Sequence, residues 1–111
     1  MFDLPGHTAG HIGFYSAPVL FCGDTLFSVG CGRLFEGTAE QLYQSLQSLA
    51  ALPDDTLICC THEYTLANLA FALSIEPDNS DLQLYLKQCQ QKRQLSEPTL
   101  PALMATEKKL N

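Results

Sequence analysis

The chain has 111 residues, a formal net charge of −6, and 46% hydrophobic against 16% charged residues. This composition is typical of one globular domain with a modest core and argues against a disordered chain. Only six lysines and arginines are present, so we expect neither a nucleic-acid surface that reads phosphates nor adhesion to an anionic membrane.

The cysteines indicate a reducing compartment. There are five of them, an odd number, and none forms a C-x-x-C pair. Cys59 and Cys60 are adjacent, so in a strand they point to opposite faces and cannot chelate one ion together. We therefore expect reduced, mostly buried cysteines in a cytoplasmic protein.

The first third of the chain predicts strands around a loop that carries histidines. Residues 2–4 look like part of a strand, and residues 5–11 (Pro-Gly-His-Thr-Ala-Gly-His) form a tight, glycine-rich loop. A strand over 11–15 and a turn then lead into the apolar run 19–22, which predicts a buried strand ending at Gly23. This strand would deliver Asp24 at its carboxyl end, where open α/β sheets place their chemistry.

The rest of the chain predicts one more strand among helices. Residues 25–37 have the composition of a loop without secondary structure of its own. The elements expected after it are a helix from Thr38 with a Gln41 capping box, a strand over 57–60, a helix from a Thr65 cap to about Ile75, a helix capped by Asn79 or Ser80, and a helical tail over 102–110. This order predicts an α/β layer followed by an α-helical extension.

Three side chains stand where a metal site would need them. His7 lies in the glycine-rich loop, Asp24 follows one predicted strand, and His62 follows another. Two imidazoles and a carboxylate suit a borderline metal such as zinc or iron. The alternative is that the histidines are ordinary core or surface residues and that Asp24 only makes a turn. Spacing alone leaves both open.

Four motifs resemble one family. Segments 5–11, 23–27 (Gly-Asp-Thr-Leu-Phe) and 62–65 (His-Glu-Tyr-Thr) occur in the order found in the metallo-β-lactamase superfamily, and segment 30–38 resembles glyoxalase II, the hydroxyacylglutathione hydrolase. The resemblance implies that residues 1–76 form the C-terminal half of a metallo-β-lactamase αββα sandwich. Residues 77–111 would begin the helical substrate-binding extension.

The resemblance also assigns metal ligands. His7, Asp24 and His62 match ligands of two divalent ions, with Asp24 as the bridging carboxylate that positions a hydroxide. Zinc is the expected metal, with iron and manganese as alternatives. The family hydrolyses S-D-lactoylglutathione to D-lactate and glutathione with a metal-bound hydroxide, a step in methylglyoxal detoxification.

Substrate contacts follow from the same resemblance. Arg33, Phe35 and Tyr64 match positions that bind the glutathione thioester, and Phe35 stands where some members have a tyrosine. His11 matches a histidine that does not bind metal, so we expect a structural role beside the ligands.

The family pattern is incomplete in this chain. The H-x-H-x-D-H motif, which supplies the other four ligands from the N-terminal half of the family, is absent. We therefore expect a middle-to-late part of a glyoxalase II, truncated at both ends, that self-associates or needs a complementing N-terminal half. The alternatives are a glutathione-persulfide dioxygenase-like member and a non-catalytic fragment.

Overall fold

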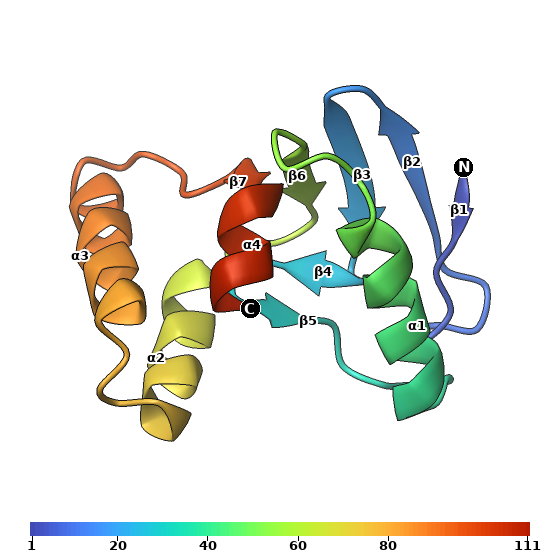
Figure 1. Ribbon diagram of the computed structural model, residues 1–111, viewed down its shortest axis with the longest axis horizontal. Helices are drawn as coiled ribbons and strands as arrows, with labels where there is room; N and C mark the ends of the chain where they lie inside the picture. The colour runs from blue at the N-terminus through green and yellow to red at the C-terminus, as the bar shows by residue number, and fades with distance from the viewer.

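A five-stranded sheet forms the centre of the protein. The computed structural model describes residues 1–111, and its strands lie side by side in the order β1 (Phe2–Asp3), β2 (Ile12–Ser16), β3 (Val19–Gly23), β6 (Leu57–Cys60) and β7 (Ala102–Leu103) (Figure 1). β3 and β6 are parallel, whereas the other neighbours are antiparallel. The predicted α/β class is confirmed, and the region expected to be a helical tail begins with β7.

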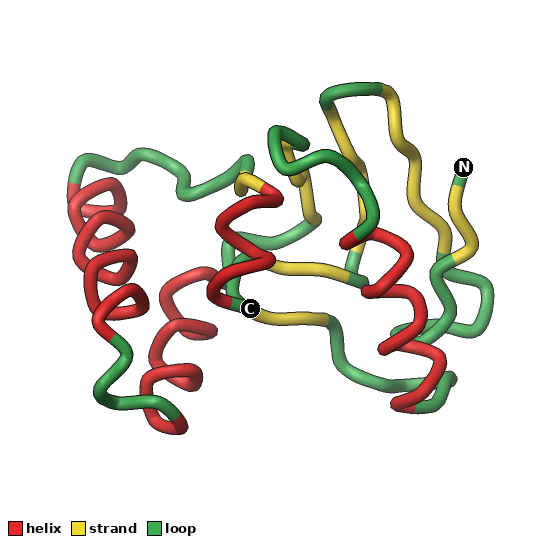
Figure 2. The backbone as a smooth tube through the Cα atoms, viewed as in Figure 1, coloured by secondary structure: helices red, strands yellow, loops and turns green.

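Four helices surround this sheet unevenly. α1 (Ala39–Ala50) and α4 (Met104–Leu110) lie over one face, while α2 (Thr65–Ile75) and α3 (Ser80–Gln94) pack against each other beside the sheet (Figure 2). The core under α1 and α4 is made of apolar side chains from four strands and both helices: Leu20, Cys22, Leu26, Leu49, Ile58, Ala102 and Met104.

Two of the three predicted helix caps are confirmed. The Thr38 side chain accepts from the Gln41 backbone N–H, and the Gln41 side chain accepts from the Thr38 N–H, which completes the capping box of α1. Asn79 caps α3 by accepting from two backbone N–H groups. The Thr65 cap is wrong: Thr65 lies inside α2, and its hydroxyl is hydrogen-bonded to the Thr99 hydroxyl instead.

The sheet face opposite α1 and α4 is uncovered. Side chains alternate along the strands, so Leu20 is fully buried while its neighbour Phe21 is 54% exposed, as is Phe14 directly across from it. The prediction that the apolar run 19–22 is buried is therefore right for one side only. We call the uncovered side the bare sheet face; its apolar members are Ile12, Phe14, Val19, Phe21, Leu57, Cys59 and Leu103.

Residues 25–37 contain secondary structure that differs from the predicted loop. β4 (Leu26–Phe27) pairs with β5 (Gly30–Cys31) in a small antiparallel hairpin. Each strand has two residues, which is too short for an alternating pattern to be visible in the sequence. The prediction of a loop without secondary structure is therefore wrong at this hairpin.

All five cysteines are free thiols, as expected, but they are less buried than predicted. Cys22 and Cys89 are buried, Cys59 and Cys60 are half-buried, and Cys31 is exposed. Burial raises the pKa of Cys22 to about 12, so its sulfur is a neutral thiol packed in the core.

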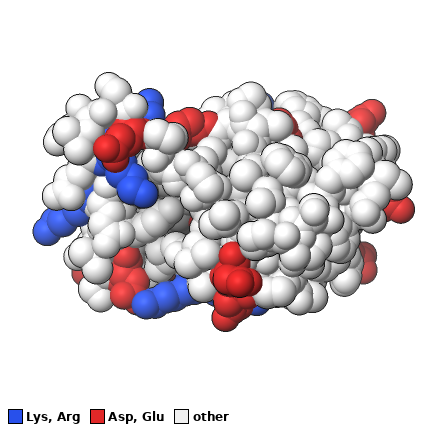
Figure 3. Space-filling model, turned by 90° about the horizontal axis from the view of Figure 1, so that it is seen from above, with Lys and Arg blue, Asp and Glu red and all other residues white.

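Charge is distributed unevenly. Five of the six basic residues belong to α3 and α4. In the view of Figure 3, basic atoms gather at the end of the molecule where α3 lies, and much of the remaining surface in that view carries no charge. None of the helices is both long enough and apolar enough to cross a membrane.

Candidate metal centre

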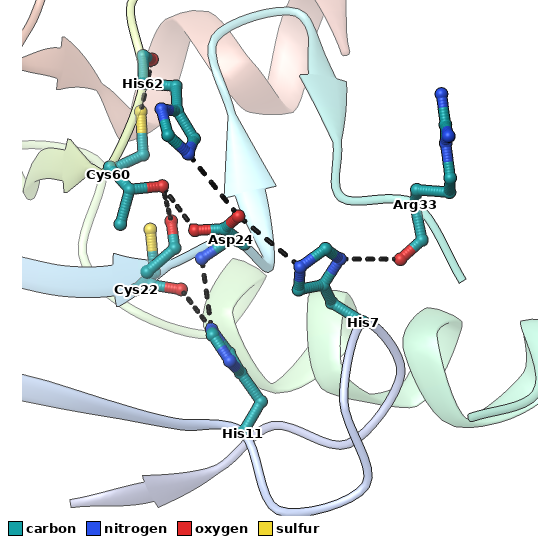
Figure 4. A network of polar contacts seen from close by, with 9 residues as sticks. His7, His11, Cys22, Asp24, Arg33, Cys60 and His62 are labelled. Carbon is teal, nitrogen blue, oxygen red and sulfur yellow. Dashed lines mark hydrogen bonds and ion pairs between the residues drawn. The ribbon is translucent and has the colours of Figure 1, made fainter. Parts of the chain in front are cut away.

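The fold brings the three predicted ligands to one edge of the sheet. β3 and β6 are parallel neighbours, and Gly23 is in register with Cys60, so the residues that follow these strands emerge together. Asp24 comes directly after β3, and His62 comes two residues after β6. The loop between β1 and β2 delivers His7 to the same place (Figure 4).

One carboxylate oxygen is shared between two imidazoles. Asp24 Oδ2 lies 3.4 Å from His7 Nε2 and 3.6 Å from His62 Nε2, and Figure 4 shows the aspartate between the two rings. The His62 side chain is 45% exposed and that of His7 only 16%. The site therefore opens to solvent on the His62 side.

The His7 ring has a defined tautomer. Its Nδ1 lies 2.7 Å from the backbone carbonyl oxygen of Arg33. A carbonyl can only accept, so Nδ1 carries the proton and donates it. In the neutral ring the lone pair is then on Nε2, the atom that faces Asp24. This is how protein histidines are prepared to bind a metal ion.

Two neighbours hold Asp24 in place through hydrogen bonds. The Asp24 backbone N–H donates to His11 Nε2 at 3.0 Å, so His11 is bound to the main chain of the loop and its other nitrogen carries the proton. The Thr61 hydroxyl donates to Asp24 Oδ1. Thr61 is not among the residues predicted for the site, although its position immediately before His62 is a usable signal.

The donor geometry fits metal binding but is incomplete. Two atoms that bind one ion at about 2.1 Å with tetrahedral angles lie about 3.4 Å apart, close to both imidazole–carboxylate separations. However, no three His, Cys, Asp or Glu side chains surround a common point. The chain thus offers two pairs of donors that share Asp24 rather than one full coordination sphere.

The predicted substrate residues lie around this edge. The Tyr64 ring stacks on His62 with centroids 4.7 Å apart, and Phe35 contacts the His7 ring edge-on at 5.0 Å. Arg33 turns its carbonyl toward His7, while its side chain extends away from Asp24 (Figure 4). Its guanidinium lies 5.8 Å from the centre of the Phe35 ring.

Glu63 joins the site to the segment before β7. Partial burial alone would raise the pKa of Glu63, but hydrogen bonds from the Thr99 hydroxyl and backbone N–H hold that pKa below its ordinary value. The carboxylate therefore stays ionised and ties the turn after His62 to Thr99.

Two cavities lie away from the candidate metal centre. One of about 440 Å³ is situated between α1 and α4, lined by Leu46, Met104 and Glu107 among others. His7, Asp24 and His62 line neither of them. The candidate metal centre is instead open to solvent at His62, whose side chain is 45% exposed.

Family models divide the chain into two parts. The model described as the metallo-beta-lactamase superfamily matches residues 3–62, more than half of the chain, and that described as the hydroxyacylglutathione hydrolase C-terminus matches residues 63–111. The chain belongs to the metallo-beta-lactamase superfamily. Within this superfamily, the predicted resemblance to hydroxyacylglutathione hydrolases is confirmed by the second match.

Relatives in the superfamily are considerably longer than this chain. The protein is 62% identical over 109 residues to a hydroxyacylglutathione hydrolase of Hamiltonella defensa and 60% identical over 111 residues to one of Citrobacter koseri. These alignments cover 98% and 100% of this chain but only 44% of each relative. The chain therefore spans less than half the length of the relatives it matches.

Solved structures of superfamily members support the fold. The crystal structure of TTHA1623 in a di-iron-bound form matches with a TM-score of 0.52 and 38% identity, over 54% of this chain and 32% of that one. The BLEG-1 B3 metallo-beta-lactamase matches with a TM-score of 0.52 and 35% identity, over 55% of this chain and 32% of that chain.

Proposed function

We propose that this chain forms one side of the active site of a hydroxyacylglutathione hydrolase, which converts S-D-lactoylglutathione and water to D-lactate and glutathione. The observation that carries the proposal is the single oxygen of Asp24 within 3.6 Å of imidazole nitrogens from two separate loops. The C-terminal family match favours this reaction over a persulfide dioxygenase.

Metal ligands are the first role of the proposal. His7, Asp24 and His62 would contribute ligands to two divalent ions, which would be zinc, or alternatively iron or manganese. When bound, such ions lower the pKa of water and polarise the thioester carbonyl. The Arg33 carbonyl keeps the His7 Nε2 lone pair directed at the site, and the Thr61 hydroxyl fixes the carboxylate plane of Asp24.

Substrate binding is the second role. Arg33 is an exposed cation at the rim of the site and pairs with a glutathione carboxylate. Tyr64, stacked on His62, is partly exposed and contacts the glutathione moiety. Phe35 supplies an apolar surface beside His7. Residues 1–76 are the metal-binding part in this proposal, and residues 77–111 begin the part that binds substrate.

Completion of the site is the third role. Two donors on each side of the metal pair are fewer than a catalytic ion requires, and the relatives contain a large region that this chain does not match. In the proposal that region supplies the remaining ligands and a second sheet packed on the bare sheet face. Without it, the chain self-associates through that face or remains a non-catalytic fragment.

Complementation tests this function. The chain is co-expressed with the part of the Hamiltonella defensa relative that precedes the matched region, and the purified mixture is assayed with S-D-lactoylglutathione and Zn²⁺. We expect a stable complex with thioesterase activity. The matched control is the same mixture with His62→Ala, which forms the complex but loses at least about 10²-fold in rate, because a ligand is missing.

Two results would contradict the proposal. One is a stable, zinc-loaded complex without thioesterase activity. The other is activity that His62→Ala leaves unchanged, which would place the chemistry outside this chain.

A further inference from the structure

Glu107 of α4 is a buried carboxylate that lies outside the candidate metal centre. It is only 4% exposed. Its Oε2 accepts from the Val29 backbone N–H at 2.8 Å, and its Oε1 accepts from the Ser28 hydroxyl at 3.1 Å. A buried carboxylate destabilises a fold unless donors compensate it, and here the donors come from Ser28–Val29, the turn between β4 and β5. The carboxylate and this turn therefore depend on each other.

The same turn is held by three further polar side chains, all from the helical part of the chain. Asn111 Nδ2 donates to the carbonyl oxygens of Gly30 at 2.9 Å and Phe27 at 3.1 Å. Asn68 Nδ2 donates to the Ser28 carbonyl at 3.1 Å, and the Tyr85 hydroxyl is 3.1 Å from Ser28 Oγ. α2, α3 and the end of α4 thus all anchor this one hairpin.

The turn needs this support because its backbone is strained. Val29 has a φ of 58°, in the left-handed region that β-branched residues avoid. A residue keeps such a conformation only where its surroundings enforce it. The 2.8 Å hydrogen bond from the Val29 N–H to Glu107 acts on that residue itself.

The hairpin carries an aromatic ring into the candidate metal centre. Phe27, the last residue of β4, is 4% exposed. Its ring centroid is 6.0 Å from that of His62 and 5.1 Å from that of Tyr64, and the latter two rings are stacked on each other. The position of Phe27 therefore limits how the His62 imidazole can turn.

We propose that Glu107 is a positioning residue for His62: it fixes the Ser28–Val29 turn, the turn fixes Phe27, and the Phe27 ring holds the imidazole toward Asp24. The C-terminal helix thereby contributes to the geometry of the metal centre without touching it. The consequence for metal affinity rests on the proposed function, whereas the effect on the His62 ring does not.

The test compares Glu107→Ala with Lys108→Ala, a matched control on the same helix. Lys108 donates to the Leu52 carbonyl and pairs with Asp54, and its hydrogen bonds do not reach the hairpin. The ring signals of ¹³C-labelled histidines are recorded by NMR at a temperature where both variants are folded, with His62 assigned from His62→Ala. Co²⁺ is titrated into the same samples.

We expect Glu107→Ala to move the His62 signal and weaken Co²⁺ binding about tenfold, whereas Lys108→Ala changes neither. Glu107→Gln, which keeps an oxygen for the Val29 N–H, restores the His62 signal. If Glu107→Ala fails to fold, Asn111→Ala, which releases the hairpin at Phe27 and Gly30, is expected to move the His62 signal in the same direction.

A folded Glu107→Ala with an unmoved His62 signal would overturn the inference, as would an equal shift in Lys108→Ala. Absence of Co²⁺ binding to the unmodified chain would show that its own three ligands are too few to hold the ion, and the comparison of His62 signals would then decide the positioning role by itself.

Discussion

At the scale of single residues, the candidate site depends on segments of main chain that pass close to one another, as well as on the predicted ligands. The closest such contact is between Gly32 and the main chain of Asp24. A Cβ placed on Gly32 would lie 1.8 Å from the Asp24 carbonyl oxygen, whereas a Cβ on Gly10 in the His7 loop would meet nothing within 4 Å. The main chain that carries Asp24 can therefore pass Gly32 only because position 32 has no side chain.

This contrast yields a matched pair of variants. Gly32→Ala forces the Asp24 segment to move, so we expect it to lower the melting temperature by at least about 4 °C, corresponding to about 1 kcal/mol or more. It should also shift the NMR signals of His7 and His62. Gly10→Ala should leave both quantities nearly unchanged. Equal effects from the two variants would refute the close-approach argument.

Glu107 makes a second residue-scale prediction, on pH. Burial raises the pKa of Glu107 above its ordinary value near 4.5, despite hydrogen bonds from Val29, Asn111 and Ser28 that lower it. Compared with the unfolded chain, the folded state therefore binds the Glu107 proton more tightly. The resulting stability is fully present below the ordinary pKa and is lost as pH rises through the raised one.

The measurement is the difference in melting temperature between the natural chain and Glu107→Gln from pH 4 to 8. As pH rises above about 4.5, we expect the melting temperature of the natural chain to fall steadily relative to that of Glu107→Gln, and the difference then to level off. Nearby Tyr85, whose pKa burial raises to about 12, does not titrate in this range. A difference that favours the natural chain increasingly with pH would contradict the prediction.

At the scale of elements, the features that the sequence predicts correctly are those with strong local signals. The capping box of α1, the Asn79 cap and the strands that precede Asp24 and His62 all have such signals, and the parallel pairing of β3 with β6 explains why Asp24 and His62 meet. The four motifs, in their order along the chain, likewise suffice to indicate the family.

The remaining features depend on contacts between distant segments. The β4–β5 hairpin consists of two-residue strands held by side chains from α2, α3 and α4, which no local pattern reveals. Thr65 has the chemistry of a cap, but Thr99, 34 residues away, binds its hydroxyl instead. Glu107 could not be predicted for the same reason, because only the tertiary structure brings it to the β4–β5 turn, whereas Thr61 has a local signal in its position immediately before His62.

At the scale of the whole molecule, the sheet is covered on one face only. Phe14 and Phe21 lie opposite each other on the bare sheet face, each 54% exposed. A contiguous apolar surface of this kind is unusual on a stable monomer and marks a surface that another layer covers. In the proposed complex that layer is the other half of the sandwich; for the chain alone we expect a second copy to take its place.

The last prediction concerns this face in the isolated chain. We expect its sedimentation to show association that increases with concentration, because burying the four phenylalanine rings of two copies is favourable. Phe14→Thr with Phe21→Thr keeps residues suited to a strand and should yield a monomer. Phe71→Gln is the matched control, since Phe71 is 69% exposed on α2 and is not part of the bare sheet face. A natural chain that remains monomeric at all concentrations, or association that persists in the double variant, would show that the bare sheet face does not drive self-association.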